Sequence, residues 1–422
     1  MRDSQNIGSA TKLDPKAEWI DWVALCIVLA LIALPHYALL RLPVMTYTVW
    51  SPELLYGLLS VSSIACIALR NKSAERILFG SFVAFVITVY FVLSVAVLKH
   101  GLAPCMSQVR YFLPFATASL VVNTAWNLRL SLVIKCIAIA CAASGIMAIS
   151  LNFGFQDFYH TLHEGNTISK NMATEGRLYW TPAAIALLIP IIFVVPMHWF
   201  LRLPILIFVT SAVALTQSRT LLFVYSGLTL VMIAKRSRSQ LKTFGFIVFV
   251  LLLIAALVFS ICDEQMIESF MNRFGLNDNF KGAIETATVV SRGEIFDYYI
   301  YQLQSYKVLG GGFGLPLFIL KDQTPVFTSD VSVLSFYFPM GLVGLCLIFT
   351  FWWICWKRIR AASRDPHVNS IAAGLQWVLC IACVVSLNLD IFSRNLFVVL
   401  LAFLIAIVRS HHFQRCNANS YK

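Results

Sequence analysis

Long apolar stretches recur along almost the whole sequence, and their length constrains what the chain can fold into. A helix needs roughly 20 apolar residues to cross the hydrocarbon core of a bilayer. Counted against that length, the sequence predicts an all-α polytopic membrane protein with about twelve transmembrane helices, at 20–40, 54–69, 77–98, 111–123, 130–151, 181–200, 203–216, 220–234, 243–261, 332–356, 371–387 and 395–408. Four spans are short and are expected to be re-entrant or to extend into their polar flanks, namely 111–123, 203–216, 220–234 and 395–408.

The composition excludes a water-soluble enzyme. Only 12% of the residues are charged and 59% are hydrophobic, whereas soluble domains carry about 25% charged residues. The net charge of +12 would suit a nucleic-acid partner in a soluble protein. In a membrane protein, basic residues record orientation instead, so membrane lipids are expected around the chain and no nucleic acid is.

The positions of lysine and arginine predict that both termini are cytoplasmic, because short cytoplasmic loops retain positive charge. With the N-terminus inside, the inner segments hold 19 of these residues and the outer segments hold 12, although the outer segments are about twice as long. Lys135 lies within a span near its inner end, where its side chain can reach the interface.

The same rule decides how residues 203–234 are interpreted. One overlong helix would place Arg219 at its middle and would move the basic clusters at 235–242 and 357–364 to the outside. Two spans keep both clusters inside. The turn formed by Gln217, Ser218 and Arg219 then lies at the outer membrane boundary, and Arg219 is a cation of the outer face.

These spans divide the chain into five parts. We expect a cytoplasmic tail at 1–19, nine transmembrane helices within 20–261, a large periplasmic loop at 262–331, three further transmembrane helices within 332–408 and a cytoplasmic tail at 409–422. The first span has no small-residue cleavage site after it, which indicates an anchor rather than a removed signal peptide.

The large outer loop is where we expect chemistry. Asp263 to Phe274 has the apolar spacing of an amphipathic helix. A second helix is expected from Ser291, because Ser291-Arg292-Gly293-Glu294 fits the capping-box pattern. It ends at the glycine run 310–314, which permits a sharp return of the chain. That run is not a phosphate-binding P-loop, since it lacks the following Lys and Ser or Thr.

Several arginines fall on the outer side, where the orientation rule disfavours them. A guanidinium binds phosphate oxygens as a two-pronged fork and keeps its charge, so they are candidate ligands of a phosphate or pyrophosphate. The alternative is an ordinary interfacial anchor or an ion pair with Asp or Glu. The loop 262–331 has five basic and nine acidic residues, so an anion site there must be local. These candidates are Arg219, Arg292, Arg177, Arg110 and Arg273.

Two carboxylates complete the candidate site. Asp330 lies where the large loop re-enters the membrane, and it can accept a proton from a sugar hydroxyl or cap the following helix. Glu294 fits a capping residue better than a base. His160 and His163 lack zinc-motif spacing, so no metal or other cofactor is expected. The scarcity of charges in the spans argues against an ion-coupled transporter.

Most of the 11 cysteines lie inside apolar runs and are expected to be small buried hydrophobes, among them Cys26, Cys66, Cys136, Cys141 and Cys380. A disulfide between Cys105 and Cys262, which fall outside the spans, is left open.

Three motifs in order resemble the bacterial O-antigen polymerase and O-antigen ligase superfamily of membrane glycosyltransferases. They are Leu215-Thr216-Gln217-Ser218-Arg219-Thr220, Ser291-Arg292 ahead of an aromatic helix, and Val308-Leu309-Gly310-Gly311-Gly312-Phe313-Gly314, followed by Gly341-Leu342-Val343-Gly344. The resemblance implies a glycan donor carried on undecaprenyl pyrophosphate at the periplasmic face of the bacterial inner membrane. It also implies that Arg219 and Arg292 hold the pyrophosphate.

One departure from the family pattern favours polymerase over ligase. Ligases of the family tend to have His-Asn where the outer loop re-enters, and this chain has Asp330-Val331 there. The resemblance thus predicts a polymerase that joins lipid-linked repeat units in O-antigen, capsule or exopolysaccharide synthesis, with a chain-length regulator as a further partner. A ligase, a transporter of lipid-linked glycans and a non-enzymatic assembly factor are the alternatives.

Overall fold

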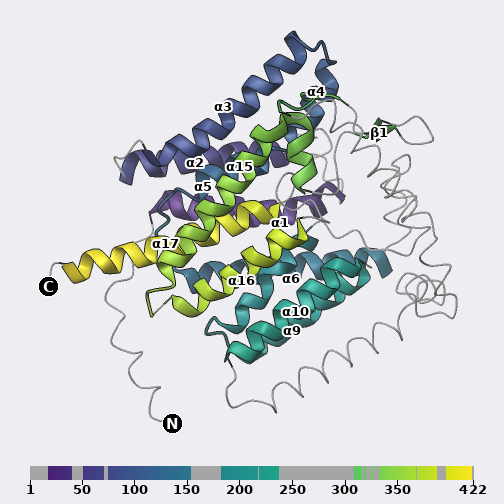
Figure 1. Ribbon diagram of the computed structural model, residues 1–422. Coiled ribbons are helices and arrows are strands. Elements are labelled where there is room, and N and C mark those ends of the chain that lie inside the picture. Colours follow the sequence, from purple (N-terminus) through teal and green to yellow (C-terminus); the bar gives the residue numbers. More distant parts are fainter. Residues whose placement is uncertain are drawn as a thin grey trace.

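The computed structural model describes residues 18–39, 51–70, 75–153, 182–216, 218–236, 308–315, 318–319, 325–326, 332–366, 368–386 and 396–420. Nearly all of this part of the chain is helical (Figure 1). The helices are α1 (Trp19–Leu39), α2 (Ser51–Arg70), α3 (Glu75–Ala96), α4 (Leu102–Arg110), α5 (Leu113–Val121), α6 (Leu130–Phe153), η2 (Ala183–Phe193), α9 (Trp199–Leu215), α10 (Arg219–Arg236), α15 (Ser332–Ala362), α16 (Asn369–Val385) and α17 (Leu396–Ser420). Two short strands, β1 (Phe318–Ile319) and β2 (Pro325–Val326), form an antiparallel pair.

A helix occupies each expected span that falls within these residues, and the expected span at 243–261 lies outside them. In the described part of the chain, four helices are long and apolar enough to cross a membrane: α2, α3, α6 and α15. Six shorter apolar helices accompany them. The structure therefore agrees with an all-helical membrane protein.

The position of α17 explains why one expected span is so short. Every residue from Phe397 to Val408 is buried, with at most 2% of its surface exposed. Helix α17 runs through the middle of the molecule against α5, α15, α16, α1 and η2 (Figure 1). A helix that is hydrophobic all round belongs in the interior of a bundle, so this span meets other helices instead of lipid. It also continues to Ser420, well into the expected C-terminal tail.

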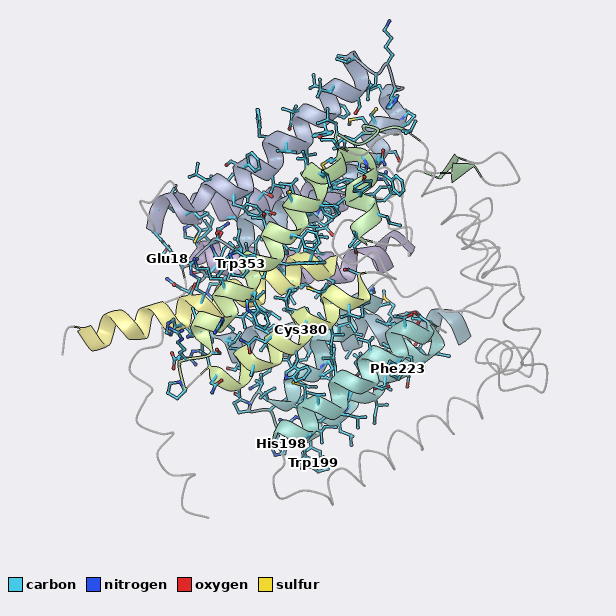
Figure 2. All side chains as sticks on the ribbon, in the orientation of Figure 1. Glu18, His198, Trp199, Phe223, Trp353 and Cys380 are labelled. Atoms are coloured by element: carbon cyan, nitrogen blue, oxygen red, sulfur yellow. The ribbon has the colours of Figure 1, made fainter. Side chains whose placement is uncertain are left out.

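Helices α2 and α3 lie at the periphery and expose large apolar side chains. On α3, Leu78, Phe82, Phe85 and Val92 are each more than half exposed and recur at helical spacing. Phe223 of α10 and Trp353 of α15, labelled in Figure 2, are 83% and 66% exposed. Water-soluble proteins rarely display contiguous apolar stripes of this size, and they suit the acyl chains of a bilayer.

The element at Ala183–Phe193 is a 3₁₀-helix, where the sequence predicted an ordinary transmembrane helix. Pro190 lies inside it, and proline removes an i to i−4 hydrogen bond and clashes with the preceding turn. Ten of its eleven residues, all except Ala183, are buried. Neighbouring helices therefore hold in place a geometry that is uncommon at this length.

Two polar clusters tie the helices together at one end of the bundle. In the first, Arg70 at the end of α2 donates from both terminal nitrogens to the fully buried Asp21 of α1, each over 2.8 Å. Arg70 also pairs with Glu18 at 2.8 Å and donates to the Ala125 carbonyl at 3.0 Å. The Asn127 backbone N–H donates to Asp21 at 3.2 Å, so the buried carboxylate is well satisfied.

The second cluster joins α15 and α17 to the same region. Arg358 donates to the Val122 carbonyl and to the Asn123 side chain. His412 lies 3.7 Å from Asp365, just after α15. Figure 1 shows that α2 and α15 end, and α6 and α9 begin, at one end of the bundle. We call it the cationic end, after the arginines in or next to these ends of the helices, namely Arg70, Arg129, Arg202, Arg358 and Arg364.

Cysteine burial agrees with the sequence in part. Cys66 and Cys141 are buried and Cys136 is partly buried, as expected. The expectation was wrong for Cys26 and Cys380, whose side chains are exposed on the protein surface. An apolar run predicts distance from water and not contact with protein, because the lipid-facing side of a helix has the same composition as its packed side.

Candidate functional site

The arginine motif forms the turn between α9 and α10. Helix α9 ends at Leu215 and α10 begins at Arg219, so residues 203–234 form two helices as predicted. The Thr216 hydroxyl donates to the Val213 carbonyl at 2.6 Å and accepts from the Ser218 N–H at 3.3 Å. The Ser218 hydroxyl accepts from the Leu221 N–H at 3.4 Å, as an N-cap does. The hydroxyls of Thr216 and Ser218 thereby stabilise the turn after which Arg219 is the first residue of α10.

Of the candidate residues, the structure places the backbone of Arg219 and the whole of Arg110. The others lie outside the described residues: Arg177, Arg273, Arg292, Glu294 and Asp330, together with His160, His163 and Cys262. The side chain of Arg219 also lies outside them. Helix α15 begins at Ser332, two positions after Asp330, and the Ser332 N–H donates to the Ser386 carbonyl at 3.0 Å.

Arg110 makes the ion pair that was the alternative to a phosphate ligand. It is the last residue of α4, and its Nε lies 3.6 Å from Glu53 in the first turn of α2. Its guanidinium also lies over the Tyr111 ring, 5.5 Å from the centroid. One third of its side chain remains exposed, compared with 15% for Glu53. Arg110 is therefore charge-compensated, although still accessible.

The glycine run fills a break in α15. At Gly341 the helix is interrupted by a positive φ of 58°. The N–H groups of Gly311 and Gly312 donate to the carbonyls of Phe338 and Pro339 at 2.7 and 3.1 Å. We call residues 308–315 the glycine loop. It supplies the backbone partners that the break removes, so that these buried peptide groups stay paired.

The reverse hydrogen bond completes this arrangement. The Leu342 N–H, just past the break, donates to the Val308 carbonyl at 3.0 Å. Because Gly311 and Gly312 donate to protein carbonyls, they do not cradle a phosphate, in agreement with the exclusion of a P-loop from sequence. Both glycine motifs thus belong to one structural joint.

Side chains from α3, α4 and their connection hold the other side of the glycine loop. The Phe313 N–H donates to Ser94 at 2.7 Å, and the Gly314 N–H donates to Gln108 at 2.7 Å. The Phe313 carbonyl accepts from His100 Nδ1 at 2.6 Å and from the Cys105 thiol at 3.2 Å. Two successive peptide units are therefore fixed by four side chains.

An aromatic chain continues the contact into the bundle. Phe313 packs edge-on against Phe112, with ring centroids 5.3 Å apart. Phe112 contacts Phe336 of α15 at 5.2 Å, and Phe336 contacts Phe115 of α5 at 4.6 Å. The glycine loop and the first turns of α15 are thus parts of one packed unit.

Cys105 is a free thiol in this unit and is completely buried. Burial raises the pKa of the Cys105 thiol, because the thiolate would lose its hydration. The thiol therefore stays protonated and donates to the Phe313 carbonyl. The sequence left a disulfide between Cys105 and Cys262 open, and Cys105 is a free thiol in the structure.

Sequence analysis missed His100, Ser94 and Gln108. Glycines at such close spacing signal a near approach of another backbone, but they do not say which one. No spacing rule joins residues 94–108 to residues 313–314, because the contact spans more than 200 positions.

We call the side of the bundle that holds the glycine loop, Arg110 and the start of α15 the glycine-loop end; in Figure 1 it lies opposite the cationic end.

Within the part of the chain that the structure describes, no three His, Cys, Asp or Glu side chains come together as a metal site. No protein-family model matches the chain, and no curated protein sequence matches it either.

Proposed function

We propose that this protein is a membrane glycosyltransferase of the O-antigen polymerase and ligase type. It joins repeat units linked to undecaprenyl pyrophosphate at the periplasmic face of the bacterial inner membrane. The observation that carries the proposal is that the start of α10, at Arg219, and the glycine loop lie at the same end of the bundle, opposite the cationic end (Figure 1). Motifs about 90 positions apart in the sequence thus share one side of the molecule.

The charge distribution supports this orientation. Lysine and arginine retained on the cytoplasmic side identify that side in a membrane protein, and the arginines of the cationic end lie in or next to four helices, namely α2, α6, α9 and α15. In the proposed arrangement the chain crosses twelve times and both termini are cytoplasmic. The glycine-loop end, with Arg219 and the loop 262–331, then faces the periplasm.

Arg219 has a physical reason to bind an anion. The N-terminus of a helix carries a partial positive charge, and a cation in the first turn is disfavoured there. An arginine at the first position of α10 therefore adds to a positive potential, and a pyrophosphate group relieves the repulsion. Arg219 and Arg292 hold the leaving group by guanidinium forks.

In this proposal, three further arginines help to bind the phosphate groups of the lipid-linked substrates. Arg177 and Arg273 lie in outer segments and assist the two principal arginines. Arg110 is held by Glu53 and is exposed enough to meet a second phosphate or a headgroup.

The reaction needs stabilisation of the pyrophosphate as negative charge develops on it, which fixed guanidinium groups supply. Asp330 orients the attacking sugar hydroxyl, with Glu294 as the second choice. In the sequence, Asp330 lies two positions before Ser332, the first residue of α15, whose N–H donates to the Ser386 carbonyl.

The test uses a strain in which the gene is deleted and variants are supplied in trans. Arg219→Ala is expected to leave single repeat units where the wild type makes a ladder of polymer. Arg219→Lys should rescue poorly, because the ammonium group has no planar fork. The matched control is Arg360→Ala, which changes an exposed arginine at the cationic end and should leave the ladder intact.

Three outcomes have different meanings. A normal ladder with Arg219→Ala contradicts the proposed role of this residue. Accumulation of long lipid-linked polymer in the deletion strain identifies a ligase. If the deletion strain makes normal polymer on the lipid carrier, and single repeat units accumulate on neither face of the membrane, the enzyme assignment is wrong.

A further inference from the structure

Helix α4 turns polar side chains inward and apolar side chains outward. Cys105 and Gln108 are buried on the side that holds the glycine loop, where they hydrogen-bond to its backbone. Leu102 and Met106, one turn apart, point away from that side and are 59% and 38% exposed. A helix on the surface of a water-soluble protein shows the reverse pattern. The outward face of α4 therefore suits an apolar neighbour better than water.

The apolar surface of α4 continues from the end of α3. Val97 and Leu98, in the connection between the two helices, are 66% and 48% exposed. Leu98 also lies against the glycine loop, since a Cβ added to Gly312 would meet its side chain at 2.6 Å. The exposed apolar stripe of α3, which includes Phe85 and Val92, thus leads directly to α4. We call the exposed apolar residues of this segment the α3–α4 surface, namely Val97, Leu98, Leu102 and Met106.

A tight turn at Lys99 separates the two helices. Lys99 has a φ of 55° and is the one residue other than glycine with a positive φ in the described part of the chain. A left-handed residue of this kind ends a helix, and Figure 1 shows α4 at the glycine-loop end of α3. Helix α4 has nine residues, whereas about 20 are needed to cross the hydrocarbon core. It therefore stays at this end of the bundle and does not cross the membrane.

The charges of this segment complement the phosphates of lipid headgroups. Residues 97–110 include Lys99, His100 and Arg110 and no aspartate or glutamate. Lys99 is exposed before the start of α4, and Arg110 at its end keeps one third of its side chain exposed beside Glu53. Lysine and arginine at a membrane surface reach the headgroups while their stems cover apolar surface. An apolar face flanked by cations is typical of a helix that lies in the interface of a bilayer.

We propose that α4 is an interfacial helix, which docks the α3–α4 surface onto the phospholipids of the leaflet at the glycine-loop end. Leu102 and Met106 contact acyl chains, and Lys99 and Arg110 contact headgroup phosphates. Because α4 also holds the glycine loop, this docking fixes the loop at the depth of the headgroups. Residues 99–110, which lie outside the expected spans, are then part of the membrane-bound surface. The inference does not depend on the proposed glycosyltransferase activity.

The test uses the wild-type full-length protein in nanodiscs of phosphatidylethanolamine and phosphatidylglycerol, which leave both faces open to the solution. A photoreactive diazirine that partitions into the bilayer labels side chains in contact with lipid. Trypsin, which cleaves after lysine and arginine, isolates α4 in one peptide, 100–110. Label on Leu102 and Met106 should match the label on Phe85 of α3. It should clearly exceed the label on Ser370, which is exposed at the start of α16.

Met106 provides a second, independent measurement. Its side chain is 38% exposed in the fold, whereas Met197 is 8% exposed. A membrane-impermeant oxidant converts methionine to its sulfoxide only where the sulfur is accessible from water. In nanodiscs Met106 should therefore be oxidised as slowly as Met197, and far more slowly than in the free peptide 100–110.

Each combination of results decides the inference. Label on α4 equal to that on Phe85, together with a protected Met106, supports it. An unlabelled α4 overturns it: if Met106 oxidises, the surface faces water, and if Met106 is protected, a second copy or another part of the chain covers the surface. Label together with rapid oxidation also overturns it, because the surface is then open to water. None of these measurements uses turnover, so loss of the proposed enzymatic function would leave the result unchanged.

Discussion

Gly310 and Gly341 pack backbone against backbone, so that a Cβ added to Gly310 would lie 2.5 Å from the Gly341 nitrogen. Both residues have a positive φ, 74° and 58°. Conformation and space therefore both require glycine at the joint between the glycine loop and α15. The two glycine motifs, distant in sequence, are the two halves of one contact.

The first prediction is that Gly310→Ala strongly destabilises the protein. A side chain in the left-handed region costs about 1–2 kcal/mol, and displacing the backbone of α15 adds to that cost. The melting temperature in detergent should fall by several degrees or more. Gly227→Ala is the control, because a Cβ on this helical glycine meets nothing within 4 Å, and alanine there should match or exceed wild-type stability. Equal melting of the two variants would contradict the contact.

The second prediction concerns Lys99. Replacing it with glycine removes the cost of a positive φ and should stabilise the protein by about 1 kcal/mol. Lys99→Ala removes the same charge but keeps a Cβ, so it should not stabilise. Thermal unfolding at equal ionic strength measures both variants. A gain with alanine would show that charge, and not backbone strain, is the source.

The third prediction is a pH dependence set by Cys105. Its pKa is raised by burial, so the folded protein holds this proton at pH values where an unfolded thiol, which ionises near pH 9, has lost it. The stability that results is present below that pH and declines as the pH rises further. Cys105→Ser can still donate to Phe313 but does not ionise. The melting temperature of the wild type relative to Cys105→Ser should fall between pH 8 and pH 10.5, and a constant difference would contradict this account.

The fourth prediction concerns the buried pair Arg70 and Asp21. Arg70→Ala leaves a fully buried carboxylate without its charge partner, and breaking such a pair costs about 3–5 kcal/mol. Removing both charges with Arg70→Met and Asp21→Asn should recover much of that loss. Arg360→Ala, at an exposed position of the same end, should change stability by less than about 0.5 kcal/mol. Folded yield and melting temperature are the measurements.

The limits of most helices could be predicted from sequence, because hydrocarbon thickness imposes length and composition on each span. Helix α1 at Trp19–Leu39 and α6 at Leu130–Phe153 match the expected 20–40 and 130–151 closely. The turn at Ser218 also followed from charge placement alone. These features depend on the bilayer, which requires the same length and the same apolar composition of every span along the chain.

Features that depend on tertiary packing could not be predicted in this way. The helix α4 carries polar residues and was not expected, and the 3₁₀ geometry around Pro190 depends on neighbours that hydropathy does not identify. Candidate residues were chosen for their charge, which favoured Arg110 and passed over His100. His100 is hydrogen-bonded to a carbonyl 213 positions away, a contact that no local pattern encodes.

The break in α15 bears on how the chain is made. Residues 308–312, which satisfy the carbonyls of Phe338 and Pro339, leave the ribosome before α15 does, as do Ser94 and Gln108, which hold them. The partner of the interrupted helix is therefore already synthesised when α15 emerges from the translocon. A permutation of the gene that moved the glycine loop behind α15 would reverse this order and expose bare peptide groups to lipid during insertion.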